Sequence, residues 1–267
     1  MTQTTNNARC LFRHYDNPAL CSPMNAAYIA IHGMDGNGGR IANANIPADY
    51  RGVLLKDSPA REGQADIYAK LDAYAKSFEK QFEDVRQALL AEGQSENEVR
   101  IKSLYLWSES PGTGKTCTSV ALMNEYMIAN FIGSLKRKET PPQRPVFLLD
   151  VNEMQTKYNE FNRPKVPEDI ADKAARTYYN AIEYAKQAPF AVLDDIGVRE
   201  SISDGFRGDL HSVINHRTTQ AKPTIYTSNI PIEELPEVFG EQRLADRVRD
   251  MCAVFHFRGE SKRGARR

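Results

Sequence analysis

The sequence predicts an α/β protein whose core is a five-stranded parallel sheet between layers of helices. From Ile101 onward, short apolar segments typical of buried strands alternate with longer segments of helical periodicity. A glycine-rich segment follows the first expected strand, and carboxylates or an amide follow two later ones. These features are typical of a doubly wound sheet with a ligand site at its carboxyl edge. The expected strands are residues 103–107, 146–151, 190–194, 224–228 and 253–257.

The composition is that of an ordinary globular protein. Hydrophobic residues make up 41% of the 267 residues and charged residues 26%, which excludes disordered and fibrous classes. Because the formal net charge is zero, any nucleic-acid site must be a local basic patch. No apolar segment approaches the roughly 20 residues that span a bilayer, and the N-terminus lacks the apolar stretch of a signal peptide. We therefore expect a cytoplasmic protein with no membrane partner.

The N-terminal residues 1–44 are rich in Asn, Gly, Pro and Ala and show no sustained periodicity, which predicts a small irregular segment. The chain contains four cysteines, Cys10, Cys21, Cys117 and Cys252. They are scattered along the sequence, which argues against a disulfide framework. Four soft or borderline ligands in this segment are candidates for a structural zinc ion: Cys10, His14, Cys21 and His32. Their spacing matches no common zinc finger. The alternative is a buried free cysteine with exposed histidines.

A domain boundary is expected near residue 44, and residues 45–267 are expected to form the main domain. An amphipathic helix is predicted at about residues 63–92, because apolar residues recur there at steps of three and four. These residues are Ile67, Leu71, Tyr74, Phe78, Phe82, Val85 and Leu89. The helix either packs on its own domain or forms a coiled coil, for which about three heptads are fewer than usual.

The segment E-S-P-G-T-G-K-T, which begins at Glu109, predicts a phosphate-binding loop. Gly112 and Gly114 allow the backbone N–H groups at a helix N-terminus to approach an anion. Lys115 is expected to reach the β- and γ-phosphates, and Thr116 to hold Mg²⁺ through its hydroxyl. Glu109 departs from the pattern, which usually begins with glycine. The alternative is a surface turn rich in glycine and proline.

Polar residues also end two of the later strands. Asp194 and Asp195 follow the apolar run P-F-A-V-L and are expected beside the phosphate loop. Asp194 is expected to bind Mg²⁺, and Asp195 to polarise the attacking water with a shorter reach than glutamate. Asn229 follows T-I-Y-T-S and is expected to orient that water or to sense the γ-phosphate. Plain Asp and Ser-Asn turns are the alternatives.

Two arginines in E-Q-R-L-A-D-R, Arg243 and Arg247, lie four residues apart and so share a helical face. A guanidinium presented to a neighbouring subunit's γ-phosphate stabilises the charge of the transition state. Both residues are therefore candidates for an arginine finger. Salt bridges to Asp246 and Asp250 are the alternative.

Taken together, these motifs resemble the Walker A, Walker B, sensor I and arginine-finger segments of AAA+ ATPases. Within that superfamily the chain is similar to the DnaC/DnaI-type replicative helicase loaders, whose branch also contains the DnaA initiators and IstB transposition ATPases. The segments I-P-A-D-Y-R, S-L-Y-L-W and I-N-H-R-T-T-Q-A-K-P-T-I-Y-T-S-N add to this likeness. The resemblance covers about residues 44–267.

The resemblance implies a slow ATPase with ATP and Mg²⁺ as cofactors. It also implies a reduced or absent C-terminal lid, and Arg263 is a candidate substitute for the sensor II arginine that such a lid carries. It implies self-association through the ATPase domain, single-stranded DNA as a ligand, and a hexameric replicative helicase engaged by residues 1–44. The nucleotide contacts that it implies are Pro111, Gly112, Thr113, Gly114, Lys115, Thr116 and Cys117.

Candidate DNA contacts follow the Walker B segment: Arg199, Arg207, His211 and Arg217, with Phe206 as a stacking group. Salt bridges to Asp204 and Asp209 are the alternative explanation of these residues.

Two other functions are consistent with the sequence. One is an IstB-like ATPase that assists a transposase, and the other is a non-catalytic, nucleotide-gated adaptor whose turnover Glu109 and Asp195 impair.

Overall fold

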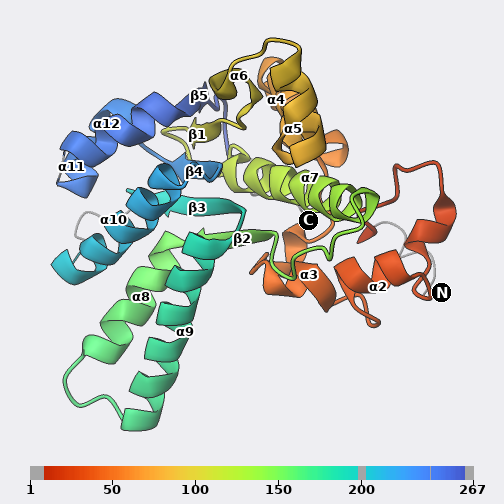
Figure 1. Cartoon of the computed structure of the whole chain (residues 1–267). Helices are drawn as coiled ribbons and strands as arrows, with labels where there is room; N and C mark the ends of the chain where they lie inside the picture. The colour runs from red at the N-terminus through yellow and green to blue at the C-terminus, as the bar shows by residue number, and fades with distance from the viewer. Residues whose placement is uncertain (1–8, 198–202, 241, 262–267) are drawn as a thin grey trace. The chain divides into compact units, whose positions relative to one another are not determined.

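The computed structural model describes residues 9–197, 203–240 and 242–261 (Figure 1). The chain divides into two compact units. Unit 1 comprises residues 1–101 and 116–147, and unit 2 comprises residues 102–115 and 148–267. The boundary expected near residue 44 therefore lies within unit 1. Among the residues described, no helix is both long and apolar enough to cross a bilayer.

The predicted parallel sheet is present, with strand order β2–β3–β4–β1–β5. Strand β1 pairs in parallel with β4 and β5, and β3 pairs in parallel with β4. Nearly all residues of β1 to β4 are buried, as expected for a parallel sheet that is covered on both faces. The α/β prediction is thus confirmed. The strands are β1 (Ser103–Trp107), β2 (Val146–Asp150), β3 (Phe190–Ile196), β4 (Thr224–Ser228) and β5 (Cys252–His256).

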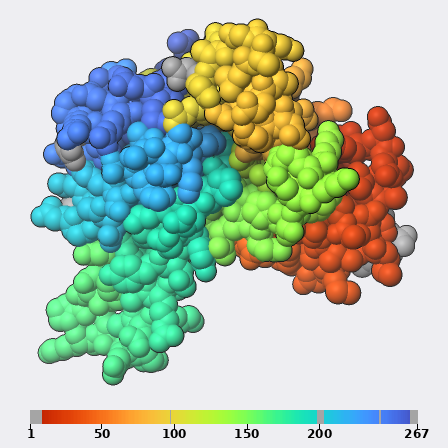
Figure 2. Space-filling model, in the orientation of Figure 1, coloured from red at the N-terminus to blue at the C-terminus, as the bar shows by residue number. Residues whose placement is uncertain are grey.

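The helices of unit 2 pack as a connected group. Helix α8 lies along α9, and the far ends of this pair extend beyond the rest of unit 2 (Figures 1 and 2). Helix α10 packs on α9 and α12, and rings of Tyr158, Tyr178 and Phe206 join α8, α9 and α10. The helices are α8 (Val151–Asn162), α9 (Glu168–Gln187), α10 (Asp204–Thr219), α11 (Leu235–Phe239) and α12 (Gln242–Met251), with the 3₁₀ turn η6 (Ile232–Glu234).

Arg217 is fully buried and fixes α10 to the connections around it. Its guanidinium donates to the carbonyl oxygens of Ala185 and Pro223 at 2.7 Å and of Ala188 at 2.8 Å. Its Nε–H donates to Thr224 Oγ1 at 2.8 Å. Because its exposed fraction is 0%, Arg217 is not available to DNA, and the expected contact is wrong. A buried arginine is rare, so its sequence context favoured an exposed role.

In unit 1 the N-terminal residues pack against α7 and the segment that follows it. Phe12 contacts Phe131 of α7, and the buried Arg40 lies over the same ring. The Arg40 guanidinium donates to the carbonyl oxygens of Pro141 and Pro142 at 2.8 and 2.9 Å. The helices are α2 (Ala26–His32), α3 (Gly39–Asn43), α4 (Ala65–Lys76), α5 (Glu83–Ala91), α6 (Glu96–Val99) and α7 (Lys115–Lys136), with 3₁₀ turns η1 (Pro18–Cys21), η2 (Ala48–Tyr50), η3 (Leu55–Asp57), η4 (Glu62–Gln64) and η5 (Ser77–Gln81).

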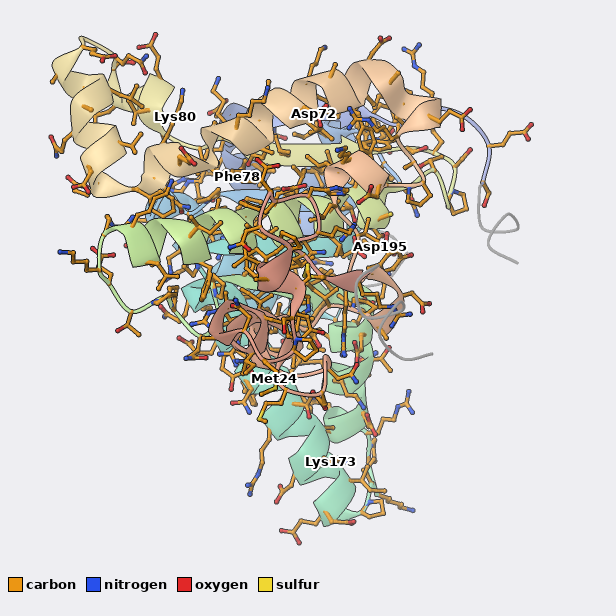
Figure 3. The ribbon with its side chains drawn as sticks, turned by 90° about the vertical axis from the view of Figure 1, so that its right-hand side faces the viewer. Met24, Asp72, Phe78, Lys80, Lys173 and Asp195 are labelled. Atoms are coloured by element: carbon orange, nitrogen blue, oxygen red, sulfur yellow. A yellow bond between two sulfur atoms is a disulfide. The ribbon has the colours of Figure 1, made fainter. Side chains whose placement is uncertain are left out.

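The single helix predicted at residues 63–92 is interrupted. Helices α4 and α5 are separated by η5 and by Phe82, whose backbone is extended. The interruption lets the Phe82 ring pack on Gly133 of α7, where an added Cβ would lie 2.2 Å from the ring. Leu71 is likewise buried, at 0% exposure, and so is Phe78 (labelled in Figure 3), at 1%. The apolar residues at the centre of the pattern therefore pack within unit 1, which contradicts the coiled-coil alternative for them.

Replacing Arg217 with alanine is expected to lower the free energy of unfolding by about 3 kcal/mol, because two buried carbonyl oxygens and one part-buried carbonyl oxygen lose their charged donor. Urea denaturation followed by circular dichroism measures this loss. The matched control is Arg176→Ala on the exposed face of α9, which is expected to change stability by less than about 0.5 kcal/mol. A stable Arg217→Ala protein that had lost only DNA affinity would contradict the structural role.

Candidate nucleotide-binding site

The phosphate loop lies in unit 2, where β1 leads toward the first residue of α7. The Ser108 N–H donates to Ser228 O at 3.2 Å, so the end of β1 stays paired with the end of β4. Gly112 (φ 79°) and Gly114 (φ 103°) adopt left-handed conformations that favour glycine. The chain can therefore turn from strand to helix at the predicted positions.

Two buried polar groups lie inside this loop. Lys115 is 5% exposed, and its Nζ donates to the carbonyl oxygens of Ser108 and Ser110 at 3.4 Å each. The buried Thr113 hydroxyl has no hydrogen-bond partner among the described residues. A buried ammonium and an unpaired hydroxyl beside a helix N-terminus fit an anionic ligand such as a phosphate group.

The carboxyl end of β3 contains a bulge. Leu193 pairs with Tyr226 and Ile196 with Ser228, so that Asp194 and Asp195 together stand opposite one residue of β4, Thr227. Asp195 has a φ of +60°, a conformation that is uncommon for residues other than glycine. Bulges of this kind turn neighbouring side chains in different directions. The two adjacent carboxylates are thereby separated: Asp194 is buried, whereas Asp195 (labelled in Figure 3) is half-buried.

The Thr227 hydroxyl connects both aspartates. It donates to Asp194 Oδ1 at 2.6 Å and accepts from the Asp195 N–H at 2.8 Å. The sequence pattern does not single out Thr227, because Asn229 is the polar residue that directly follows the apolar strand. Asn229 lies two residues further on, after the end of β4, and is half-buried. Thr227 could have been identified as a hydroxyl residue opposite an acidic pair on a neighbouring strand. Recognising that pattern requires the register of the two strands, which the sequence alone does not give.

Other residues predicted to contact nucleotide are divided between the units. Pro111 is exposed on the loop of unit 2. Thr116 and Cys117 belong to unit 1, and the Cys117 side chain is buried with its sulfur 3.7 Å from Ser58 Oγ. The Cys117 side chain is thus directed into unit 1. The roles of Thr116 and Asp194 as Mg²⁺ ligands stay predictions.

The two arginines of α12 border a polar cleft of about 370 Å³. Arg243 is exposed, whereas Arg247 is half-buried and donates to Asn215 Oδ1 of α10. Among the described residues, Asp246 accepts from Gln242 and Arg249 at 2.9 and 3.0 Å, which is not the pairing with Arg243 or Arg247 that the salt-bridge alternative supposed. The cleft leaves both arginines as candidates for contact with an anion.

The remaining DNA candidates do not form one exposed patch. Arg207 pairs with Asp204 at 3.7 Å, as the salt-bridge alternative predicted. Phe206 is 0% exposed and cannot stack on a base, so this expectation is wrong. The His211 ring nitrogen lies 3.0 Å from Phe239 O. Arg199 and Arg263 lie outside the described residues.

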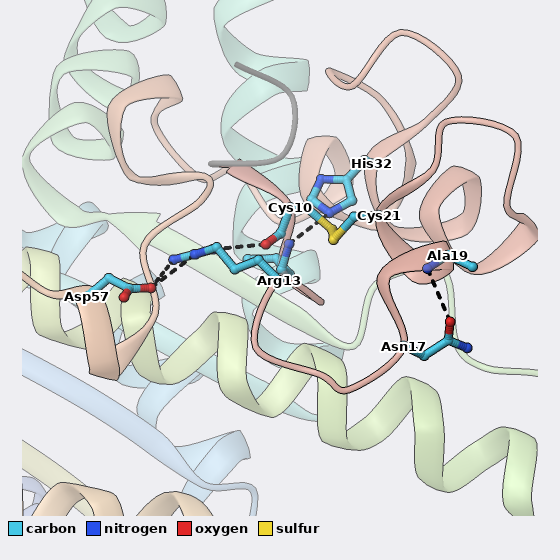
Figure 4. Close-up of a disulfide and its surroundings, with 8 residues drawn as sticks. Cys10, Arg13, Asn17, Ala19, Cys21, His32 and Asp57 are labelled. Atoms are coloured by element: carbon cyan, nitrogen blue, oxygen red, sulfur yellow. Dashed lines mark hydrogen bonds and ion pairs between the residues drawn. A yellow bond between two sulfur atoms is a disulfide. The ribbon is translucent and has the colours of Figure 1, made fainter. Parts of the chain in front are cut away.

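The predicted zinc ligands are engaged in other contacts, and Figure 4 shows those of Cys10, Cys21 and His32. Cys10 and Cys21 form a disulfide with a Cα–Cα distance of 5.8 Å, which corrects the zinc hypothesis for these two residues. A disulfide sulfur is not the thiolate that zinc requires. His14 Nε2 lies 2.6 Å from Asp57 Oδ2, and the Leu11 N–H donates to His32 Nε2 at 3.2 Å. In the described part of the chain, no group of three or more His, Cys, Asp or Glu residues is arranged to hold a metal ion.

His32 is held neutral by its surroundings. Burial and the nearby Arg13 guanidinium lower the pKa of His32 to about 4. A neutral imidazole has an acceptor nitrogen, which the Leu11 N–H uses. The histidine therefore contributes to the packing around the disulfide.

Comparison with known proteins agrees with the predicted resemblance. No family model matches the chain. The replicative helicase loader DnaI of Bacillus subtilis (strain 168) is 29% identical over 174 residues, which are 61% of this chain and 48% of DnaI. The chain thus spans about half the length of this curated relative. The likeness lies in the sequence of the matched part.

Three crystal structures share the fold. The match to DnaI covers 84% of this chain and 100% of the DnaI chain in the crystal structure, with a TM-score of 0.53 and 20% identity. A putative primosome component from Streptococcus pyogenes serotype M3 covers 84% and 98%, with a TM-score of 0.51 and 22% identity. The DnaC helicase loader covers 79% and 100%, with a TM-score of 0.51 and 18% identity. The resemblance to DnaC/DnaI-type loaders is confirmed, and these structures share the α/β fold of this chain.

The denatured, unreduced chain is expected to contain two reactive thiols, Cys117 and Cys252, and four after reduction with dithiothreitol. Thiol titration gives both counts. Cys10→Ser is expected to lower the free energy of unfolding by about 3 kcal/mol, because the short loop loses its covalent constraint. Stoichiometric zinc in the purified protein, lost together with the fold in Cys10→Ser, would contradict the disulfide.

Proposed function

We propose that the chain is an ATP-dependent helicase loader: an AAA+ ATPase that binds ATP and Mg²⁺ and helps to place a hexameric replicative helicase on single-stranded DNA. The observation that carries the proposal is the arrangement at the carboxyl ends of β3, β4 and β1. There the Thr227-linked aspartates and the phosphate loop follow neighbouring strands of one sheet. This is where open α/β sheets bind ligands.

Each residue of this arrangement has a defined task in the proposed site. The loop N–H groups and the Lys115 ammonium bind the phosphates, and the buried Thr113 hydroxyl offers a further donor. Asp194 would hold Mg²⁺, whose positive charge would offset the developing charge on the phosphates, and Thr116 stays a sequence prediction as a further ligand. Asp195 accepts a proton from the attacking water. Its short side chain is consistent with slow turnover, which suffices for a switch.

The proposed site is completed by a second copy of the chain. Arg243 or Arg247, beside the cleft of α10 and α12, contacts the γ-phosphate held by a neighbouring subunit. The exposure of Arg243 favours it, because a residue that acts on another subunit must reach beyond its own surface. Self-association is therefore part of the proposal.

The helicase is proposed to contact residues 1–44. Because Arg40 joins these residues to Pro141 and Pro142, the binding partner should be sought with the whole chain. Of the described DNA candidates, Arg207 alone stays in the proposal, with 35% of its side chain exposed. An IstB-like role with a transposase and a non-catalytic adaptor are the alternatives that the experiment below distinguishes.

The whole chain is expected to bind ATP and hydrolyse it slowly, and Lys115→Ala is expected to abolish both, because the loop loses its only ammonium. Asp195→Asn is expected to retain ATP binding and to reduce turnover about a hundredfold. ATP binding and phosphate release are measured alongside affinity capture from the native cell. A captured transposase would favour the IstB-like role. Wild-type turnover no higher than that of Lys115→Ala, with a helicase captured by both, would favour the adaptor.

Thr227→Val is expected to reduce turnover about ten- to a hundredfold, because Asp194 loses a charge-assisted hydrogen bond and the Asp195 backbone N–H loses its acceptor. Thr227→Ser is the matched control, since it keeps the hydroxyl and is expected to stay within about threefold of wild type. Steady-state phosphate release at saturating ATP measures both. No loss in Thr227→Val, or an equal loss in Thr227→Ser, would contradict a specific role of the hydroxyl.

A further inference from the structure

Trp107, Glu109 and His256 form a cluster beside the phosphate loop that the proposed mechanism does not use. Trp107 and His256 are register partners in β1 and β5. Their rings are stacked, with centroids 3.9 Å apart and planes inclined by 4°. His256 Nε2 lies 3.1 Å from Glu109 Oε2. The imidazole is therefore held between an indole ring and a carboxylate.

The contact with His256 involves a residue that departs from the usual phosphate-loop pattern. Glu109 is the first residue of the phosphate loop, where glycine is usual. A hydrogen bond from its own backbone N–H and the contact with His256 lower the pKa of its carboxyl below the usual value. Glu109 thus carries a negative charge in the loop that would hold phosphate groups. A carboxylate that turned toward those phosphates would repel them.

The order of the strands shows in which direction this charge is drawn. Strand β5 is at the edge of the sheet next to β1, whereas β4 and β3 lie on the other side of β1. His256 ends β5, and Thr227 and Asp194 lie at the ends of β4 and β3. The contact with His256 therefore draws the Glu109 carboxylate toward the opposite edge of the sheet from the Thr227-linked aspartates.

We propose that His256 is a positioning residue that holds the Glu109 carboxylate away from a bound nucleoside triphosphate. This inference rests on the proposed ATP binding and adds to it a reason why the loop functions without its usual first glycine. His256 acts through Glu109, and Trp107 fixes the plane of the imidazole by stacking on it. The three residues together adapt the loop to an acidic first position.

A purely structural role for the pair makes a different prediction. Glu109 is 70% exposed, and a polar contact as exposed as this one contributes little to stability. If His256 only supported the end of β5, its removal would affect nucleotide binding equally whether or not residue 109 was charged. The dependence on that charge therefore separates the two roles.

The test is a double-mutant cycle on the full chain, with ATP affinity in the presence of Mg²⁺ measured by isothermal titration calorimetry. His256→Ala is expected to weaken binding about five- to tenfold, because the released carboxylate approaches the phosphates. In a Glu109→Gln background, the same change is expected to alter affinity by less than about twofold. His256→Gln keeps an N–H donor for Glu109 and is expected to restore most of the affinity.

Equal weakening by His256→Ala in both backgrounds would overturn the proposal, and so would no weakening in either. If His256→Ala folds poorly, His256→Gln takes its place in the cycle. A loss of affinity in His256→Gln that Glu109→Gln does not relieve would also contradict the proposal. Lys115→Ala is measured in parallel. If wild type binds ATP no better than Lys115→Ala, the proposed function fails together with the inference. If wild type binds ATP and the cycle is additive, only the inference fails.

Discussion

The hydroxyl of Thr227 holds the carboxyl ends of β3 and β4 together, and the candidate site depends on this contact. Two adjacent carboxylates at a strand end repel each other, and the bulge in β3 separates them only if its geometry is maintained. The hydroxyl maintains it by donating to Asp194 and accepting from the Asp195 backbone. The next residue of β4, Ser228, accepts from Ser108. One short strand thus positions the acidic pair on one side and the phosphate loop on the other.

The features predicted from the sequence are those that neighbouring residues determine. The strands were predicted to within two residues, because each is a short apolar run bounded by polar or turn-forming residues. The phosphate loop was predicted because its glycines and Lys115 are adjacent in the chain. The acidic pair was predicted for the same reason. The fold class followed from the alternation of these elements.

The features that were not predicted depend on contacts between distant residues. Arg217 is buried and donates to carbonyl oxygens up to 32 residues away in the chain. The residues next to it in the sequence therefore do not distinguish it from a surface arginine. Cys10 and Cys21 meet through the turns between them, whereas their spacing alone suggested soft metal ligands. The helix at residues 63–92 is broken because Phe82 packs on Gly133, some 50 residues later. In each case tertiary packing outweighs a correct local pattern.

The stacked ring beside the phosphate loop gives the chain a built-in optical probe. Trp107 is the sole tryptophan of the sequence, so tryptophan emission from the protein arises from one place. That indole lies against His256, which in turn contacts the first residue of the loop. Its emission therefore reports the local state of the imidazole and of the loop entrance, with no added label and no background from other indoles.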